Sequence, residues 1–158
     1  MRVPVVAGNW KMNGTRASVE ALMSAIKAGA RADWQSRILV CAPFPYLDQI
    51  SHIAENTVLT VGAQNLSEYA AGAYTGEVSG EMLVDVGCGH VIIGHSERRS
   101  LYGESDQQVA AKFVRAQQAG LIPILCIGES LQERQSGKTL PVVERQLQAV
   151  IEAAGVAA

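Results

Sequence analysis

Short runs of apolar, largely β-branched residues alternate along this chain with longer segments of helical period, and this alternation limits the possible folds more than any other feature. The runs that predict strands are residues 3–7, 37–42, 58–62, 90–94 and 121–127. Because they are almost continuously apolar, we expect parallel strands that are covered on both faces. The segments that predict helices are residues 16–28, 46–54, 80–86, 105–119 and 139–154. Strands and helices in this order predict an α/β protein with right-handed crossovers.

The order of elements leaves two architectures open. One is an open, doubly wound sheet, and the other is part of an eight-stranded barrel, which takes about 250 residues in full. No linker or break in composition divides the 158 residues, so we expect one domain over residues 1–158. Residues 65–79 form the longest irregular stretch. A loop of that length in a compact α/β protein is usually functional.

Composition excludes several classes of function. The formal net charge is -2, and no basic cluster that could face a nucleic acid is visible. No run approaches the roughly 20 apolar residues of a membrane span, and the apolar run at the N-terminus is too short for a secretory signal. We therefore expect a cytoplasmic protein without nucleic-acid or membrane partners. The three cysteines lie far apart, which favours reduced thiols over a disulfide framework or a metal site.

Polar residues follow three of the predicted strands, at the edge of a parallel sheet where ligands usually bind. Lys11 could bind an anion there, or it could be a solvated loop lysine. His95 could act as an acid, a base or a hydrogen-bond donor, and its alternative is a structural histidine beside surface ion pairs. We expect Glu97 to pair with Lys11 and Ser96 to cap a helical turn. Glu129 is a further candidate.

Two further serines, Ser105 and Ser130, fit the patterns of helix caps. Ser105 with Gln108 three residues later is typical of a capping box at the start of a helix. Ser130 could likewise cap a helix, and that capping role competes with a functional role for this segment next to Glu129.

The polar segments also carry a family resemblance. Residues 6–14 read VAGNWKMNG, residues 62–65 read GAQN and residues 72–77 read GAYTGE. Residues 93–99 read IGHSERR, and residues 126–129 read CIGE. In this order and at this spacing, the motifs resemble those of triosephosphate isomerase, and they extend over the whole chain.

The resemblance implies a (β/α)₈ barrel that interconverts dihydroxyacetone phosphate and D-glyceraldehyde 3-phosphate through an enediolate, in glycolysis and gluconeogenesis, without a cofactor or metal. It implies that Asn9 and Lys11 bind substrate and that Lys11 also acts in catalysis. The matching histidine, His95, is established in this family as a neutral imidazole that polarises the substrate carbonyl. The positions implied to support the site are Ser96, Glu97, Cys126 and Glu129. The loop around Thr75 matches the arm of a homodimer.

The family's general base is a glutamate after the sixth strand, followed by a mobile lid and by phosphate-binding loops. The pattern in this sequence covers about five of the eight βα units. Because proton abstraction needs a base within reach of the substrate, we expect the 158-residue chain to be inactive by itself. The alternative is a non-catalytic part of a barrel that self-assembles through exposed strand edges.

Overall fold

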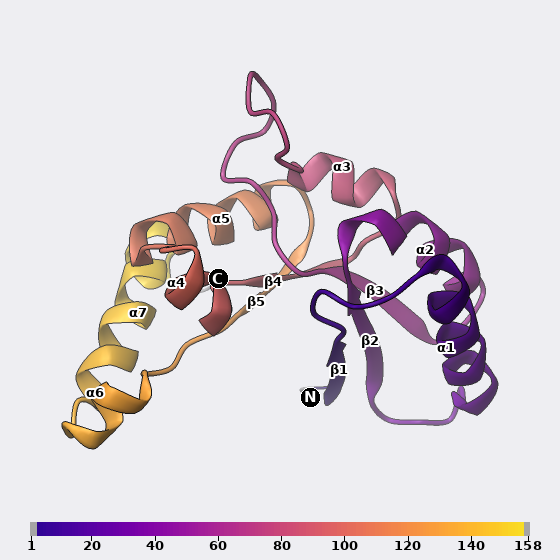
Figure 1. Ribbon diagram of the computed structural model, residues 1–158, viewed down its shortest axis with the longest axis horizontal. Coiled ribbons are helices and arrows are strands. Elements are labelled where there is room, and N and C mark those ends of the chain that lie inside the picture. The colour runs from indigo at the N-terminus through magenta and orange to yellow at the C-terminus, as the bar shows by residue number, and fades with distance from the viewer. Residues whose placement is uncertain (1–2, 157–158) are drawn as a thin grey trace.

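The computed structural model describes residues 3–156 and contains one parallel sheet of five strands in the order β1-β2-β3-β4-β5. The strands are β1 Val5–Asn9, β2 Arg37–Ala42, β3 Leu59–Ala63, β4 His90–Ile93 and β5 Ile122–Leu125. Each strand lies beside its predecessor in the chain, whereas a doubly wound sheet reverses its order partway. The sheet curls in Figure 1, with helices flanking it. The fold is therefore part of a (β/α)₈ barrel, as the resemblance implied.

All five predicted helical segments are present. They are α1 Arg16–Gly29, α2 Leu47–Ala54, α3 Gly80–Asp85, α5 Asp106–Gln118 and α7 Thr139–Ala154. A short 3₁₀ turn, Phe44–Tyr46, precedes α2 and takes up the start of the segment predicted there. Two further helices, α4 Ser96–Leu101 and α6 Leu131–Gln135, were not predicted, because helices of six and five residues are too short to show a helical period.

The helix caps agree with the sequence at two positions and differ at one. Ser105 and Gln108 form the predicted capping box of α5. Ser130 caps α6, which confirms its structural interpretation. The expectation that Ser96 caps a turn is wrong: His95 is the N-cap of α4, and Ser96 is the first residue of that helix. An imidazole nitrogen can accept a backbone hydrogen bond as a hydroxyl does, so this histidine takes the cap position.

The main hydrophobic core lies between the sheet and the helices. In β2, Val40 and Ala42 belong to this core, and the alternate residues Leu39 and Cys41 form a smaller cluster with Ile92 on the other face. The strands β2, β3 and β4 are therefore buried on both faces. The expectation of two covered faces is wrong for β1, whose first four residues are exposed. It is also wrong at the start of β5, where Ile122 is exposed.

The segment between β3 and α3 forms an arm, residues 65–79, that extends beyond the rest of the fold in Figure 1. A hydrogen bond from the Ser67 amide to the Val78 carbonyl closes its base at 2.8 Å. Within the arm, the rings of Tyr69 and Tyr74 stack with their centroids 4.0 Å apart, and Thr75 is exposed. No helix within residues 3–156 has the length and apolar character needed to cross a bilayer.

Candidate active site

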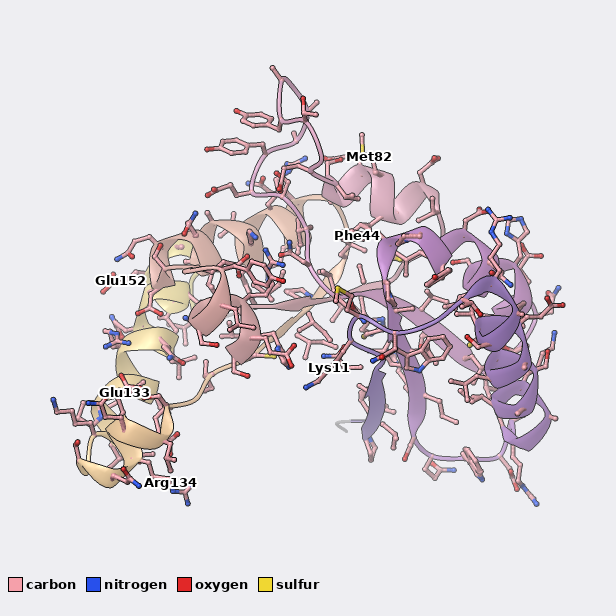
Figure 2. All side chains as sticks on the ribbon, viewed as in Figure 1. Lys11, Phe44, Met82, Glu133, Arg134 and Glu152 are labelled. Atoms are coloured by element: carbon pink, nitrogen blue, oxygen red, sulfur yellow. The ribbon has the colours of Figure 1, made fainter. Side chains whose placement is uncertain are left out.

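A cavity of about 330 Å³ lies at the carboxyl ends of the strands. The residues that line it come from the end of β1 and from the segments that follow β1, β2, β3 and β4, with α4 among them. They are Asn9, Lys11, Met12, Pro43, Phe44, Pro45, Gln64, Asn65, His95, Glu97, Arg98 and Tyr102. Figure 2 shows Lys11 near the centre of the molecule, extending from the loop after β1 toward the half of the fold that contains α4. We call this space the Lys11 cavity.

The backbone around Lys11 is held by amide side chains. Lys11 has a left-handed conformation with φ of +54°, which is uncommon for a residue with a side chain. Its amide donates to the Asn9 side-chain oxygen at 3.0 Å. The Gln64 side-chain amide donates to the carbonyl of Lys11 at 2.9 Å and to that of Cys41 at 3.1 Å. Asn9 and Gln64 thus fix the turn that directs the lysine into the cavity.

Lys11 and Glu97 form the predicted ion pair, with 2.6 Å between Nζ and Oε1. Both side chains remain about half exposed. The hydrogen bond from Lys11 holds the pKa of the Glu97 carboxyl below its usual range, and the nearby charge of Lys11 acts in the same direction. The pair joins the loop after β1 to α4, and it leaves the half-exposed ammonium group within reach of an anion in the cavity.

The His95 ring is oriented by the helix that it caps. Its Nδ1 accepts a hydrogen bond from the Glu97 amide at 3.3 Å. Nδ1 also lies 3.4 Å from Glu97 Oε2, a contact that would need a proton on Nδ1. A backbone N–H can only donate, and the Glu97 amide is the hydrogen-bond partner of Nδ1, so we assign the proton of the neutral ring to Nε2. Among residues 3–156, Nε2 has no hydrogen-bond partner, so its N–H can donate to a ligand in the cavity that His95 lines.

Four of the predicted site residues therefore come together: Asn9, Lys11, His95 and Glu97 line one cavity. Among these four, the functional groups of Lys11 and His95 each lie within contact distance of the Glu97 carboxylate. The Asn9 side chain instead supports the backbone of Lys11.

The other supporting residues lie elsewhere. Ser96 and Glu129 line a second cavity of about 670 Å³, between α4, α5 and the segment that follows β5. Glu129 accepts a hydrogen bond from the Thr139 hydroxyl at 3.2 Å and lies 3.7 Å from Arg134. Cys126 packs beside Leu39 and its neighbours on the inner face of the sheet. A supporting role for Ser96, Cys126 and Glu129 stays a prediction.

Sequence reasoning assigned no role to several residues that line the Lys11 cavity. Gln64 was part of a family motif, yet its two hydrogen bonds depend on the packing of three strands. Arg98 was also within a motif, and it bonds Glu104 at 2.6 Å while forming part of the cavity wall. Phe44 and Tyr102 gave no chemical signal in the sequence.

Among residues 3–156, no group of three or more His, Cys, Asp or Glu side chains is placed to hold a metal ion.

Comparisons with known proteins agree with the resemblance. The family model for triosephosphate isomerase matches residues 4–158. A triosephosphate isomerase from Thiobacillus denitrificans is 57% identical over 157 residues, which are 99% of this chain and 62% of the relative. One from Dechloromonas aromatica is 52% identical over 158 residues, 63% of its length. The crystal structure of the enzyme from Bartonella henselae superimposes with a TM-score of 0.88 at 44% identity, covering 94% of this chain and 62% of that one.

Proposed function

This chain belongs to the triosephosphate isomerase family, and from that premise we propose that it binds a triose phosphate and contributes to the interconversion of dihydroxyacetone phosphate and glyceraldehyde 3-phosphate. It spans about 62% of the length of its relatives. The observation that carries the proposal is the convergence of the Lys11 ammonium and the His95 imidazole on one cavity.

The two groups suit the chemistry of an enediolate. A triose phosphate has an anionic phosphate, and its carbonyl oxygen becomes negatively charged as a proton leaves the neighbouring carbon. Lys11 supplies a positive charge for both anionic centres. His95 supplies a donor at Nε2 whose direction is set by the bond from the Glu97 amide. Preorganised donors that face a developing charge are usually the largest single contribution to catalysis.

Proton abstraction needs a base, and the described residues limit the choice. Within residues 3–156, Glu97 is the only carboxylate that lines the Lys11 cavity. Its Oε1 accepts from Lys11, and this hydrogen bond lowers the pKa of the carboxyl, which makes it a weaker base than a free glutamate. We infer that a group other than Glu97 acts as the base. We propose that this chain supplies the electrophilic and charge-binding half of the reaction.

A coupled isomerase assay tests this division of roles. The purified chain is assayed alone and together with the segment by which the Thiobacillus denitrificans relative exceeds its length, with His95→Ala prepared in parallel. We expect background turnover from the chain alone and turnover from the mixture that His95→Ala abolishes. Turnover by the chain alone that His95→Ala removes would show that a base is already present and that the proposed division is wrong.

We also propose that the chain forms a homodimer through the arm. The arm exposes Thr75 and the stacked rings of Tyr69 and Tyr74, which are 46% and 42% exposed. Apolar rings held in a projecting loop suit insertion into a second copy. Sedimentation should show a dimer that Thr75→Arg shifts toward monomer. A monomer at every concentration tested would rule out the dimer.

A second candidate is assembly through strand edges, and the exposure of the outer strands favours it. Val5 and Val6 in β1 are 49% and 63% exposed, and Ile122 in β5 is 50% exposed. Within residues 3–156, β1 pairs only with β2, and β5 pairs only with β4. Open edges invite pairing with another chain. Assemblies larger than a dimer that persist in Thr75→Arg would support this candidate, whereas a defined dimer would exclude it.

A further inference from the structure

The turn that leads from β4 to His95 is packed against an arginine of the following helix. β4 ends at Ile93, and Gly94 turns the chain with φ of +66°. A Cβ atom at Gly94 would lie 2.8 Å from the Val109 side chain and 2.9 Å from Nη2 of Arg99. The backbone immediately before His95 therefore rests directly on the Arg99 guanidinium and on the core of α5.

The Arg99 guanidinium bonds three separate parts of the fold. Its Nε donates to the Gly94 carbonyl at 2.8 Å, and Nη1 donates to Asp106 Oδ1 at 2.6 Å. Nη2 donates to the Cys126 carbonyl at 3.4 Å. One planar group thus joins the end of β4, the residue that follows β5 and the first residue of α5. A lysine ammonium could not reach these three acceptors in one plane.

Asp106 extends the connection to α7. Its Oδ2 accepts from Nε of Arg145 at 2.8 Å, so the carboxylate holds two arginines at once. The Arg99 and Asp106 side chains are each only 14% exposed, whereas Arg145 is 60% exposed. A largely buried ion pair is costly to break, because the remaining charge is left without a partner. The ion pair between Arg99 and Asp106 should therefore be harder to break than the bond between Asp106 and the exposed Arg145.

Neither Arg99 nor Asp106 lines the Lys11 cavity; both line the second cavity, behind α4. The helix that they hold has six residues, too few to be stable by itself. His95 caps that helix, and the Arg99 amide donates back to the His95 carbonyl at 3.1 Å. Any rotation of α4 would move the Glu97 amide away from Nδ1 of His95 and would free the ring to exchange tautomers.

We propose that Arg99 and Asp106 are positioning residues for His95. They lock the first turn of α4 to the ends of β4 and β5, and they thereby keep the proton of the imidazole on Nε2, facing the cavity. This inference rests on the proposed function, because the direction of Nε2–H matters only if a ligand binds there. The substitutions that test it are Arg99→Lys, which keeps the charge, and Asp106→Asn, which keeps the shape.

The test uses ¹⁵N-histidine labelling of the 158-residue chain and the nitrogen shifts of the imidazole rings. In the native chain we expect two well-separated His95 resonances, with the proton on Nε2. In Arg99→Lys and Asp106→Asn we expect that separation to be lost through tautomer exchange, while the signals of His52 and His90 stay in place. Arg145→Ala should reduce the separation less, because it removes only the exposed partner of Asp106.

A matched control is Arg134→Ala, which removes a 76% exposed arginine at the outer end of α6 in Figure 2 and should leave His95 unchanged. A native His95 spectrum in folded Arg99→Lys and Asp106→Asn would overturn the proposal. So would loss of folding in both variants, or a parallel change in all three histidines, because the pair would then be generally structural.

Binding of inorganic phosphate to the same samples separates this inference from the proposed function. The affinity for phosphate should be alike in the native chain and in Arg99→Lys, because Lys11 does not contact the altered group. If phosphate fails to shift the resonances of Lys11 even in the native chain, the proposed function loses support. The histidine spectra would still decide the positioning role.

Discussion

The two halves of the Lys11 cavity are built in different ways. His95 follows β4, a central strand whose four residues are all buried. Lys11 follows β1, an outer strand whose first four residues are exposed. The His95 half is anchored by the core and by largely buried ion pairs. The Lys11 half depends on hydrogen bonds that Lys11 donates to the side chains of Asn9 and Glu97 and on one that its carbonyl accepts from Gln64.

This contrast teaches that one site can combine a rigid and an adjustable part. A hydrogen-bond donor must point accurately at a carbonyl oxygen, and the buried strand supplies that accuracy. A positive charge acts over a longer range and tolerates movement. The groups therefore match the supports that hold them, and substitutions in the two halves should have effects of different size.

The largest effect is expected from the buried charge network of the His95 half. Glu104 accepts from both Arg98 and Lys112, and these bonds join α4 to α5; Lys112 also bonds Asn65 at the base of the arm. Glu104→Gln leaves the 6% exposed Lys112 without its carboxylate partner. We expect a loss of about 3–5 kcal/mol in the free energy of unfolding near neutral pH, measured by urea denaturation.

The same variant has a defined pH dependence. Burial alone would raise the pKa of the Glu104 carboxyl, but the bonds and charges of Lys112 and Arg98 hold it below the usual 4.5. Stabilisation by a group with a lowered pKa is complete above its unfolded pKa and is lost as the pH falls through the folded pKa. The difference between native and Glu104→Gln should therefore shrink below about pH 4.5. A constant difference from neutral to acid pH would contradict the network.

The next comparison is between the two strands themselves. Ile93 is fully buried at the end of β4, whereas Val6 in β1 is 63% exposed. Ile93→Ala should cost about 2–5 kcal/mol in the free energy of unfolding, and Val6→Ala should change it by no more than about 0.5 kcal/mol. Urea denaturation of both variants measures the contrast. Similar losses in the two would mean that β1 is packed as firmly as β4.

A smaller effect is expected at the turn before His95. Gly94→Ala puts a side chain into a left-handed conformation and against Val109. We expect a loss of about 1–3 kcal/mol, together with a change in the His95 ring signals. Gly89→Ala is the control, because an added Cβ there meets nothing within 4 Å. Equal thermal unfolding of the two variants would show that an alanine fits at position 94 without strain.

The smallest effect is expected in the Lys11 half. Gln64→Ala removes the bonds to the carbonyls of Lys11 and Cys41 and should cost about 1 kcal/mol in stability. Phosphate affinity should fall more clearly than stability, because the freed turn no longer directs the ammonium group into the cavity. Calorimetric titration measures the affinity, with exposed Gln117→Ala as the control. Unchanged affinity would show that Asn9 and Glu97 hold Lys11 in place without Gln64.

The sequence predicts the central part of the fold better than its edges, for a physical reason. Residues 37–42 coincide with β2, because a strand buried on both faces is continuously apolar. The first strand begins two residues later than predicted and ends at Asn9, because an outer strand is defined by its pairing with β2 rather than by its own apolar character. The short helices α4 and α6 depend on their caps, His95 and Ser130.

The candidate site follows the same division. Lys11, His95 and Glu97 were predictable, because each lies close after a predicted strand and parallel strands bring such residues to one edge. The supports of these residues were not. Gln64 and Arg99 act through carbonyls that are distant in sequence, at Cys41 and Cys126. Contacts of this kind depend on how the strands pack, and no local pattern records them.

The most direct test of the account is a titration of the ¹⁵N-labelled chain with dihydroxyacetone phosphate, followed by the backbone amide signals. We expect shifts at Lys11, His95 and Glu97, and their loss in Lys11→Met. Shifts confined to Gly128, Glu129 and Ser130 would place the ligand in the second cavity. That result would contradict the proposal that Lys11 and His95 bind the triose phosphate in the Lys11 cavity.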